Sequence, residues 1–273
     1  MQRVLTAQMS YNFCSPRVRM LALLPVPMIR RSEHNTFKSG RLTNLRDLLS
    51  RAFYRRQVVT SRLLLKHGVD INHISGRGST PLFHLYNPGR TENLSPELLE
   101  MLISHGFANV NVQSVEGWSG LHRAAAYGSA EDVRHLLYYK ADTTLRTCKL
   151  LWTPIFCSVR FGNQDTLREL AGVEGSFIKR LVDIRGWSLL HIAVDYGSFQ
   201  VIPFLLKAGL DPHAYSCASD RSLPPELQGR RLTSIDIAEY HGPERVEKYH
   251  DVLRLAGLET VLDEEGDIFW PAE

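Results

Sequence analysis

The chain has 273 residues, and 44% of them are hydrophobic, which excludes disorder throughout and leaves material for a sizeable core. Its formal net charge of +3 is small for this length and argues against a dedicated nucleic-acid or membrane binder. The four cysteines include no CxxC pair, so neither a disulfide scaffold nor a common zinc motif is indicated. A reducing compartment, the cytoplasm or the nucleus, is therefore expected.

Residues 1–40 are predicted to form a basic tail that is disordered or weakly ordered. Residues 1–46 carry eight Lys or Arg against the single acid Glu33. The apolar run MLALLPVPMI at 20–29 contains two prolines and is too short to span a bilayer. A secretory or mitochondrial targeting segment is an open alternative.

A second alternative for this region is a degenerate F-box-like segment. The stretch LALLPVPMIRR at 21–31, followed by NLRDLLSRAFYRR at 44–56, is similar to the Leu-Pro opening of F-box modules, although most of the expected apolar helices are missing. That resemblance implies a substrate-recognition adaptor of a ubiquitin ligase.

Residues 41–257 form an internal repeat. The stretch GWSGLHRAAAYGSAEDVRHLLYYKAD at 117–142 matches GWSLLHIAVDYGSFQVIPFLLKAGLD at 186–211, at an offset of 69 residues. The segment LWTPIFCSVRFGNQDTLRELA at 151–171 falls halfway, so the period is about 34 residues. GSTPLFHLYNPG at 78–89 and LTSIDIAEYHG at 232–242 extend the series to five or six units.

Each unit is predicted to contain two short antiparallel helices followed by an extended hairpin. Ser119, Thr153 and Ser188 are hydroxyl residues placed to cap the start of the first helix. Ser129 with Asp132 forms a capping-box pattern at the start of the second helix, which carries an apolar stripe at helical spacing. Such a unit cannot bury its own apolar faces, so neighbouring units must stack.

This pattern closely resembles the ankyrin repeat, whose units run from a G-x-T-P-L-H-x-A-A opening to a G-A-D-V-N ending. The resemblance covers about four fifths of the chain. It implies an all-α repeat solenoid of five to six stacked units, in which helix-turn-helix units are joined by β-hairpin loops. It further implies a non-enzymatic protein–protein interaction scaffold that binds a partner protein through its concave face and hairpin fingers. We expect a monomer with no nucleic-acid or membrane partner.

Several units depart from the family pattern. Leu151 replaces the opening Gly of the fourth unit, and Gly120 stands where the third unit should carry Pro. Pro203 falls in the expected second helix of the fifth unit, where it would remove a backbone hydrogen bond. We expect these units to form but to be less stable than regular ones.

The sequence contains no catalytic, metal or cofactor motif. There is no G-x-S-x-G elbow, Walker-type loop or H-E-x-x-H pattern. His122 has His191 as its counterpart in the fifth unit, but Phe83, Phe156 and Asp236 stand at the same position elsewhere. We therefore predict a structural role for His122, hydrogen-bonded near the start of its helix, and no enzymatic activity.

Three tryptophans are the candidate contact residues. Trp118, Trp152 and Trp187 each precede the capping hydroxyl, so they recur once per unit along the predicted fingers. Because tryptophan is a frequent interface anchor, we predict partner binding by this ladder and its neighbours. These neighbours are the charged residues Glu116, Lys149 and Arg185. Packing against the adjacent finger is the alternative role for the tryptophans.

Two insertions and the C-terminal segment complete the chain. Extra residues lie between 89 and 98 and within 214–231, and inserted loops often carry recognition. Residues 258–273 are predicted to form an acidic tail, since positions 259–273 hold six acids and no base. This tail is either a short partner-binding motif or a cap on the last unit.

Overall fold

The computed structural model describes residues 45–75, 77–86, 96–107, 109–217, 222–257, 261–262 and 268–269. The chain divides into two units, Met1–Thr43 and Asn44–Glu273, and all described residues belong to the second. The predicted basic tail and the F-box-like stretch at 21–31 lie outside the described residues. The same holds for most of the insertion at 89–98 and most of the acidic tail.

Six helix pairs follow one another through the described residues. The first helices of the pairs are α2 (Leu45–Tyr54), α4 (Pro81–Leu85), α6 (Gly120–Tyr127), α8 (Pro154–Arg160), α10 (Leu189–Tyr196) and α12 (Ser234–His241). The second helices are α3 (Val58–Lys66), α5 (Pro96–Ser104), α7 (Ala130–Tyr138), α9 (Gln164–Glu174), α11 (Ile202–Lys207) and α13 (Pro243–Leu255). The prediction of an all-α solenoid with five to six units is confirmed.

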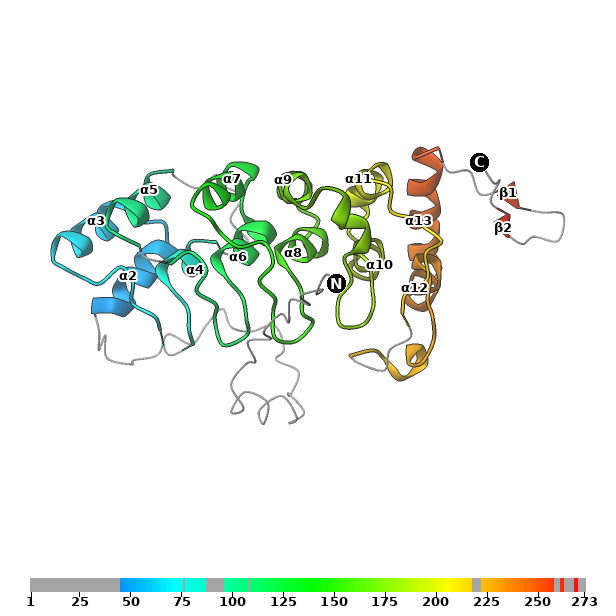
Figure 1. Ribbon diagram of the computed structural model, residues 1–273, viewed down its shortest axis with the longest axis horizontal. Helices are drawn as coiled ribbons and strands as arrows, with labels where there is room; N and C mark the ends of the chain where they lie inside the picture. Colours follow the sequence, from blue (N-terminus) through cyan, green and yellow to red (C-terminus); the bar gives the residue numbers. More distant parts are fainter. Residues whose placement is uncertain are drawn as a thin grey trace, which may run out of the picture. The chain divides into compact units, whose positions relative to one another are not determined.

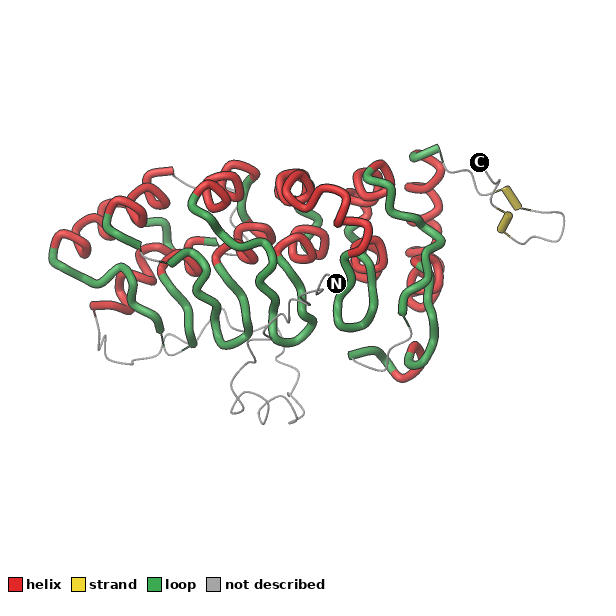
Figure 2. Tube along the Cα trace, in the orientation of Figure 1, coloured by secondary structure: helices red, strands yellow, loops and turns green. Residues whose placement is uncertain are grey.

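The helices form two layers. Each first helix contacts the next first helix, from α2 through α4, α6, α8 and α10 to α12. The second helices form the other layer, with contacts between α3 and α5, α7 and α9, and α11 and α13. Figures 1 and 2 show the connecting loops projecting from one side of the stack, beyond the first helices.

The predicted hairpin fingers are the loops that lead from each pair to the next. One backbone hydrogen bond closes every finger near its base: Ser75 N to Ser79 O, Ser114 N to Trp118 O, Thr147 N to Trp152 O, Asp183 N to Trp187 O and Ser216 N to Leu232 O. Neighbouring fingers are also joined: Val115 N to Arg77 O, Cys148 N to Glu116 O, Ile184 N to Leu150 O and Cys217 N to Gly186 O. The fingers therefore form a laterally bonded row, in which backbone groups of adjacent units satisfy one another.

The starts of the first helices follow the sequence pattern in most units. Thr80, Ser119 and Thr233 each accept the backbone N–H three residues later. Thr153 is an exception to the prediction, because its hydroxyl does not cap α8. The predicted capping box of Ser129 and Asp132 is present at the start of α7, with both reciprocal bonds formed.

The second helices end in the left-handed backbone conformation. Gly68, Gly106 and Gly209 have φ of 75°, 78° and 84° after α3, α5 and α11. Lys140 occupies the same place after α7 with φ of 63°, where a side chain carries a steric penalty that glycine avoids. The third unit is therefore locally strained at its helix end.

Two departures from the family pattern have physical explanations. Pro203 does not interrupt a helix: a 3₁₀ turn, η2 (Phe199–Val201), precedes it, and Pro203 lies in the first turn of α11, where an N–H has no helical partner. The expectation that it removes a helix hydrogen bond is wrong. At Gly120, a Cβ would lie 2.7 Å from Leu82 Cδ2, so glycine permits the close approach of α6 to the second unit.

Short elements complete the described structure. The stretch after α9, which lacks a regular repeat ending, forms the 3₁₀ helix η1 (Gly175–Arg180). A further 3₁₀ turn, η3 (Pro225–Leu227), lies in the insertion before α12. Strands β1 (Val261–Leu262) and β2 (Ile268–Phe269) pair antiparallel in the C-terminal segment. No helix among the described residues is long and apolar enough to cross a bilayer.

The core is one continuous cluster of apolar side chains between the helix layers. Small residues of the first helices, such as Ala124 and Ala125, are fully buried and allow the layers to approach. Leucines of the second helices, such as Leu136 and Leu167, are no more than 1% exposed. Each such leucine contributes about 2–3 kcal/mol through burial of apolar surface, so stacking is the main source of stability.

Candidate functional site

The tryptophan ladder is largely internal. Trp152 and Trp187 are each 1% exposed, while Trp118 is half-buried. The Trp152 indole donates a hydrogen bond to Asp183 Oδ2 at 3.0 Å, on the next finger, and meets the Tyr196 ring edge-on at 5.7 Å. The prediction that Trp152 and Trp187 are contact residues is thus wrong for the folded chain, because both rings are buried. Trp152 packs against the adjacent finger, whereas Trp187 is covered by Arg185 of its own finger, 3.9 Å from the ring centre.

The charged neighbours of the tryptophans differ in exposure. Arg185 is buried at 5% exposure and forms an ion pair with Asp183 at 2.8 Å, so it is not a surface contact. Glu116 and Lys149 are exposed on their fingers. A contact role for these two, and for Trp118, stays a prediction.

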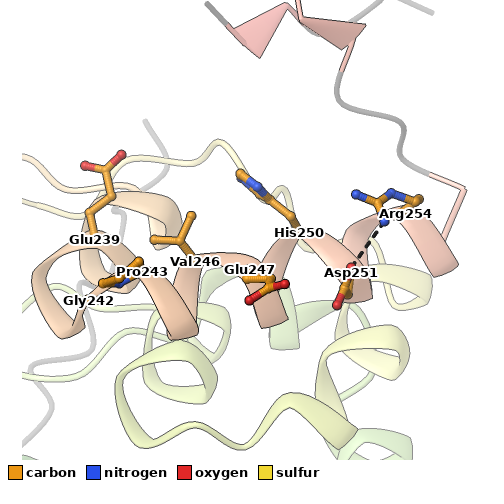
Figure 3. A pocket seen from close by; sticks show the side chains of 8 residues that line it. All are labelled: Glu239, Gly242, Pro243, Val246, Glu247, His250, Asp251 and Arg254. Carbon is orange, nitrogen blue, oxygen red and sulfur yellow. Dashed lines mark hydrogen bonds and ion pairs between the residues drawn. The ribbon is translucent and has the colours of Figure 1, made fainter.

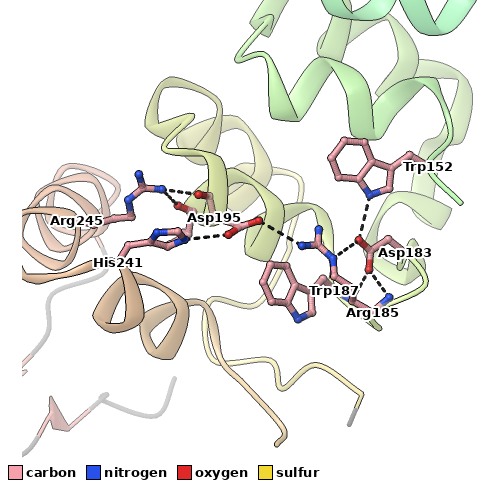
Figure 4. A network of polar contacts seen from close by, with 8 residues as sticks. Trp152, Asp183, Arg185, Trp187, Asp195, His241 and Arg245 are labelled. Atoms are coloured by element: carbon pink, nitrogen blue, oxygen red, sulfur yellow. Dashed lines mark hydrogen bonds and ion pairs between the residues drawn. The ribbon is translucent and has the colours of Figure 1, made fainter. Parts of the chain in front are cut away.

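A polar network fixes the fourth, fifth and sixth units together (Figure 4). Asp183 Oδ2 accepts from Trp152 and from Arg185, and Arg185 Nη1 reaches Asp195 Oδ2 at 3.3 Å. Asp195 Oδ1 lies 2.9 Å from His241 Nε2 in α12. Because each buried charge has an opposite charge and further hydrogen bonds, the network holds the register of these units.

Both repeat histidines are structural, as predicted. His122 Nδ1 lies 2.8 Å from Ser119 Oγ, and its Nε2 lies 3.0 Å from Trp152 O in the next unit. His191 repeats this geometry with Ser188 Oγ and Leu232 O. Burial lowers the pKa of His122 to about 4, so the ring is neutral at physiological pH and links adjacent units rather than transferring protons.

A row of arginine and aromatic side chains, partly buried or exposed, crosses the first helices, and we call it the arginine–aromatic row. It consists of Phe83, Arg123, Tyr127, Phe161, Arg160 and Tyr196. The Arg123 guanidinium lies 4.7 Å from the Phe83 ring centre and 5.2 Å from that of Tyr127. The Tyr127 and Phe161 rings are 4.7 Å apart, and Arg160 lies 5.0 Å from Phe161 and 4.7 Å from Tyr196.

The arginine–aromatic row has the composition of a binding surface. Phe161 and Tyr196 are 37% and 39% exposed although they are large apolar rings. Tyrosine and arginine are enriched in interface hot spots, and each cation–π contact holds a guanidinium in place before a partner arrives. This row continues over four units, from Phe83 in the second to Tyr196 in the fifth.

Sequence reasoning missed this row, although a signal was present. Tyr127, Phe161 and Tyr196 each directly precede the glycine that ends the first helix, at a spacing of one repeat. An aromatic residue in that place lies on the last turn of the helix, away from the buried stripe. The repeated aromatic–Gly pair could therefore have identified the surface.

Two cavities flank the described repeats. One, of about 600 Å³, lies on the last unit along α13 and is lined by Glu239, Glu247, His250, Asp251 and Arg254, of which Asp251 and Arg254 form an ion pair (Figure 3). The other, of about 200 Å³, lies between the fourth and fifth fingers and is lined by Arg146, Thr153, Arg180, Asp183 and apolar side chains.

Within the described residues no group of three or more His, Cys, Asp or Glu side chains is placed to hold a metal ion. Burial raises the pKa of the Cys157 thiol, which is fully enclosed and thus unreactive.

The stacked helix pairs, the laterally bonded fingers and the histidine links define a helical repeat solenoid, a class in which each unit contacts mainly its neighbours. The family model "Ankyrin repeats (3 copies)" matches residues 49–147 and 121–216, which together cover more than half of the chain. The chain belongs to the ankyrin-repeat family. Ankyrin repeats generally mediate protein–protein interaction.

Several curated proteins are similar over the repeats. Human "SH3 and multiple ankyrin repeat domains protein 2" is 26% identical over 58% of this chain and 8% of its own length. The mouse "B-cell lymphoma 3 protein homolog" is 39% identical over 32% of the chain and 18% of its own length. Bovine "Ankyrin repeat and SOCS box protein 3" is 30% identical over 60% of the chain and 30% of its own length. The chain thus spans less than a third of each of these relatives.

Proposed function

We propose that this protein is a non-enzymatic interaction scaffold that binds a partner protein across its first helices, through the arginine–aromatic row. The observation that carries the proposal is the unbroken series of ring and guanidinium contacts from Phe83 to Tyr196, in which the Phe161 and Tyr196 rings remain exposed. The family membership supports a protein as the ligand. The exposed finger residues Glu116 and Lys149 extend the proposed surface.

We further propose an intracellular location, in the cytoplasm or nucleus, and this is supported by Cys148, Cys157 and Cys217, which form no disulfide within the described residues. Fluorescence microscopy of the tagged full chain tests it, and a secreted product would contradict it. The ubiquitin-ligase adaptor remains an alternative, whose carrying segment lies outside the described residues. Absence of a Skp1-type protein from the purified complex would remove that alternative.

The function is tested by affinity purification of the tagged full chain, with quantitative mass spectrometry. Phe161→Ala/Tyr196→Ala removes two rings from the row, and Tyr138→Ala/Tyr139→Ala removes two exposed rings at the end of α7 as a matched control. We expect partners retained by the wild type and the control to be depleted about tenfold or more from the row variant, since hot-spot rings often carry over 1.4 kcal/mol each.

Circular dichroism must first show that both variants keep wild-type helicity. Partners retained equally by a folded row variant would contradict this surface. A wild-type chain that enriches no protein over an untagged control would contradict the function itself.

A further inference from the structure

The cavity between the fourth and fifth fingers has an unusual electrostatic balance. Arg146 on one finger and Arg180 at the end of η1 both line it and are exposed. Neither has an ion pair with any residue in the described part of the chain. The single carboxylate among the lining residues is Asp183.

The charge of Asp183 is already balanced by other groups. Its Oδ2 accepts from the Trp152 indole and from Arg185 Nε at 2.8 Å. Its Oδ1 accepts from the backbone N–H groups of Arg185 and Trp187, at 2.8 and 3.2 Å. Because Arg185 forms the ion pair with Asp183, the charges of Arg146 and Arg180 are not offset at the cavity, which is electropositive.

The remaining lining groups suit an anionic side chain. Thr153 is buried, and its hydroxyl has no hydrogen-bond partner among the described residues, whereas Thr80 in the second unit uses its hydroxyl to cap a helix. Leu151, Phe156 and Val182 provide apolar contact for methylene groups. A volume of about 200 Å³ is below the roughly 300–1,000 Å³ of small-molecule sites, so the cavity suits one side chain better than a cofactor.

The walls of the cavity are held in place before binding. Ile184 N donates to Leu150 O across the two fingers, and the Trp152 indole is anchored to Asp183 on the other side. A preformed pocket lowers the ordering cost of binding. The two fingers lead into α8, which carries Arg160 and no Asp or Glu, and into α10, whose one carboxylate, Asp195, is paired with Arg185 and His241. Neither helix therefore adds an unpaired carboxylate beside the cavity.

We propose that this cavity, between Arg146 and Arg180, receives an aspartate or glutamate side chain from an acidic segment of the partner. The proposal rests on the proposed protein-binding function and specifies the chemistry of the partner. Arginine pairs bind carboxylates through charge-assisted hydrogen bonds, which are about twice as strong as neutral ones. The acid would enter the finger cavity while the rest of the segment lies along the arginine–aromatic row.

The test uses the intact chain and a phage-displayed library of random dodecapeptides. Selections are run on the wild type, on Arg146→Gln/Arg180→Gln, and on Arg134→Gln/Arg168→Gln. The control pair lies on α7 and α9, where the arginines are 61% and 52% exposed, so it removes the same charge from the second helices. Selected peptides are then measured by fluorescence anisotropy, each beside a version with Gln in place of Glu and Asn in place of Asp.

We expect the wild type and the control to select peptides rich in Asp and Glu, and the cavity variant to bind them about tenfold more weakly. The amide versions should bind the wild type and the cavity variant equally, because the interaction energy belongs to the pair of charges. Neutral or basic selected peptides, no selected peptides, or equal loss in both variants would overturn the proposal. Binding that arises only after removal of residues 258–273 would assign the cavity to the chain's own acidic segment and would also overturn it.

The two proposals fail in different ways. If the wild type purifies with partner proteins and the folded cavity variant retains all of them, the acidic-segment proposal fails and the scaffold function stands. If the wild type purifies with no partner protein, the scaffold function itself fails, whatever the cavity variant does.

Discussion

Replacing Asp183 by alanine should be among the most destabilising single changes in the repeats. The Asp183 side chain is 0% exposed, that of Arg185 is 6% exposed, and their ion pair measures 2.8 Å. Alanine would leave the Arg185 charge buried beside Asp195 alone, and the Trp152 indole without an acceptor. Removing one member of a buried ion pair costs about 3–5 kcal/mol, a large share of the roughly 5–15 kcal/mol by which domains are stable.

The measurement is urea unfolding followed by circular dichroism, with hydrogen exchange to locate the loss in the fourth and fifth units. Asp165→Ala is the matched control, because Asp165 pairs with Arg168 at 3.3 Å while 73% and 52% of the two side chains are exposed. Its cost should stay below about 1 kcal/mol. If Asp183→Ala cost no more than Asp165→Ala, the network would not hold these units together, and the reasoning would be refuted.

Three further outcomes are expected. The free energy of unfolding should fall by about 2 kcal/mol from pH 7 to pH 5 through His122 alone, because its folded pKa of about 4 lies below the usual 6.5 and protonation favours the unfolded chain. Urea titrations of the wild type and of His122→Phe at both pH values test this, and an equal change of unfolding free energy with pH in the two proteins would contradict it. Lys140→Gly should raise the free energy of unfolding by about 1 kcal/mol by removing a side chain at φ of 63°, and a lower urea midpoint would refute the strain argument. Trp187→Phe should destabilise the protein less than Trp152→Phe, because the buried Trp187 Nε1 has no hydrogen-bond partner in the described chain whereas Trp152 Nε1 donates to Asp183. A lower thermal midpoint for Trp187→Phe than for Trp152→Phe would contradict this.

The helical framework was predictable because it depends on local spacing. A hydroxyl residue at the start and a glycine nine positions later specify one short helix, and the same spacing recurs in several units. The structural role of His122 followed from this, since phenylalanine and aspartate occupy its position in other units. Repetition made each local signal reinforce the others.

The fate of the tryptophans was not predictable in the same way. Trp118 and Trp187 share the local sequence Gly-Trp-Ser, yet Trp187 is buried under Arg185 at 3.9 Å while Trp118 is half-buried. Arg185 lies two positions before Trp187 on the same finger, where the third finger carries the exposed Glu116 instead. For Trp152 the covering groups, Asp183 and the Tyr196 ring, lie in the next unit, and a pattern within one unit does not report such burial.

The positions at which the fourth unit departs from the repeat pattern line the cavity between the fourth and fifth fingers. Leu151 has φ of 55°, where the corresponding Gly78, Gly117 and Gly186 have φ of 74°, 80° and 74°, and such a conformation costs a side-chain residue about 1–2 kcal/mol. Thr153 in the same unit gives up a helix cap worth about 1 kcal/mol. Both residues line the cavity between the fingers. Strained backbone and polar groups without partners tend to cluster where a structure serves binding rather than stability. The start of the fourth unit, which departs most from the repeat pattern, therefore coincides with the cavity that we propose binds an acidic side chain.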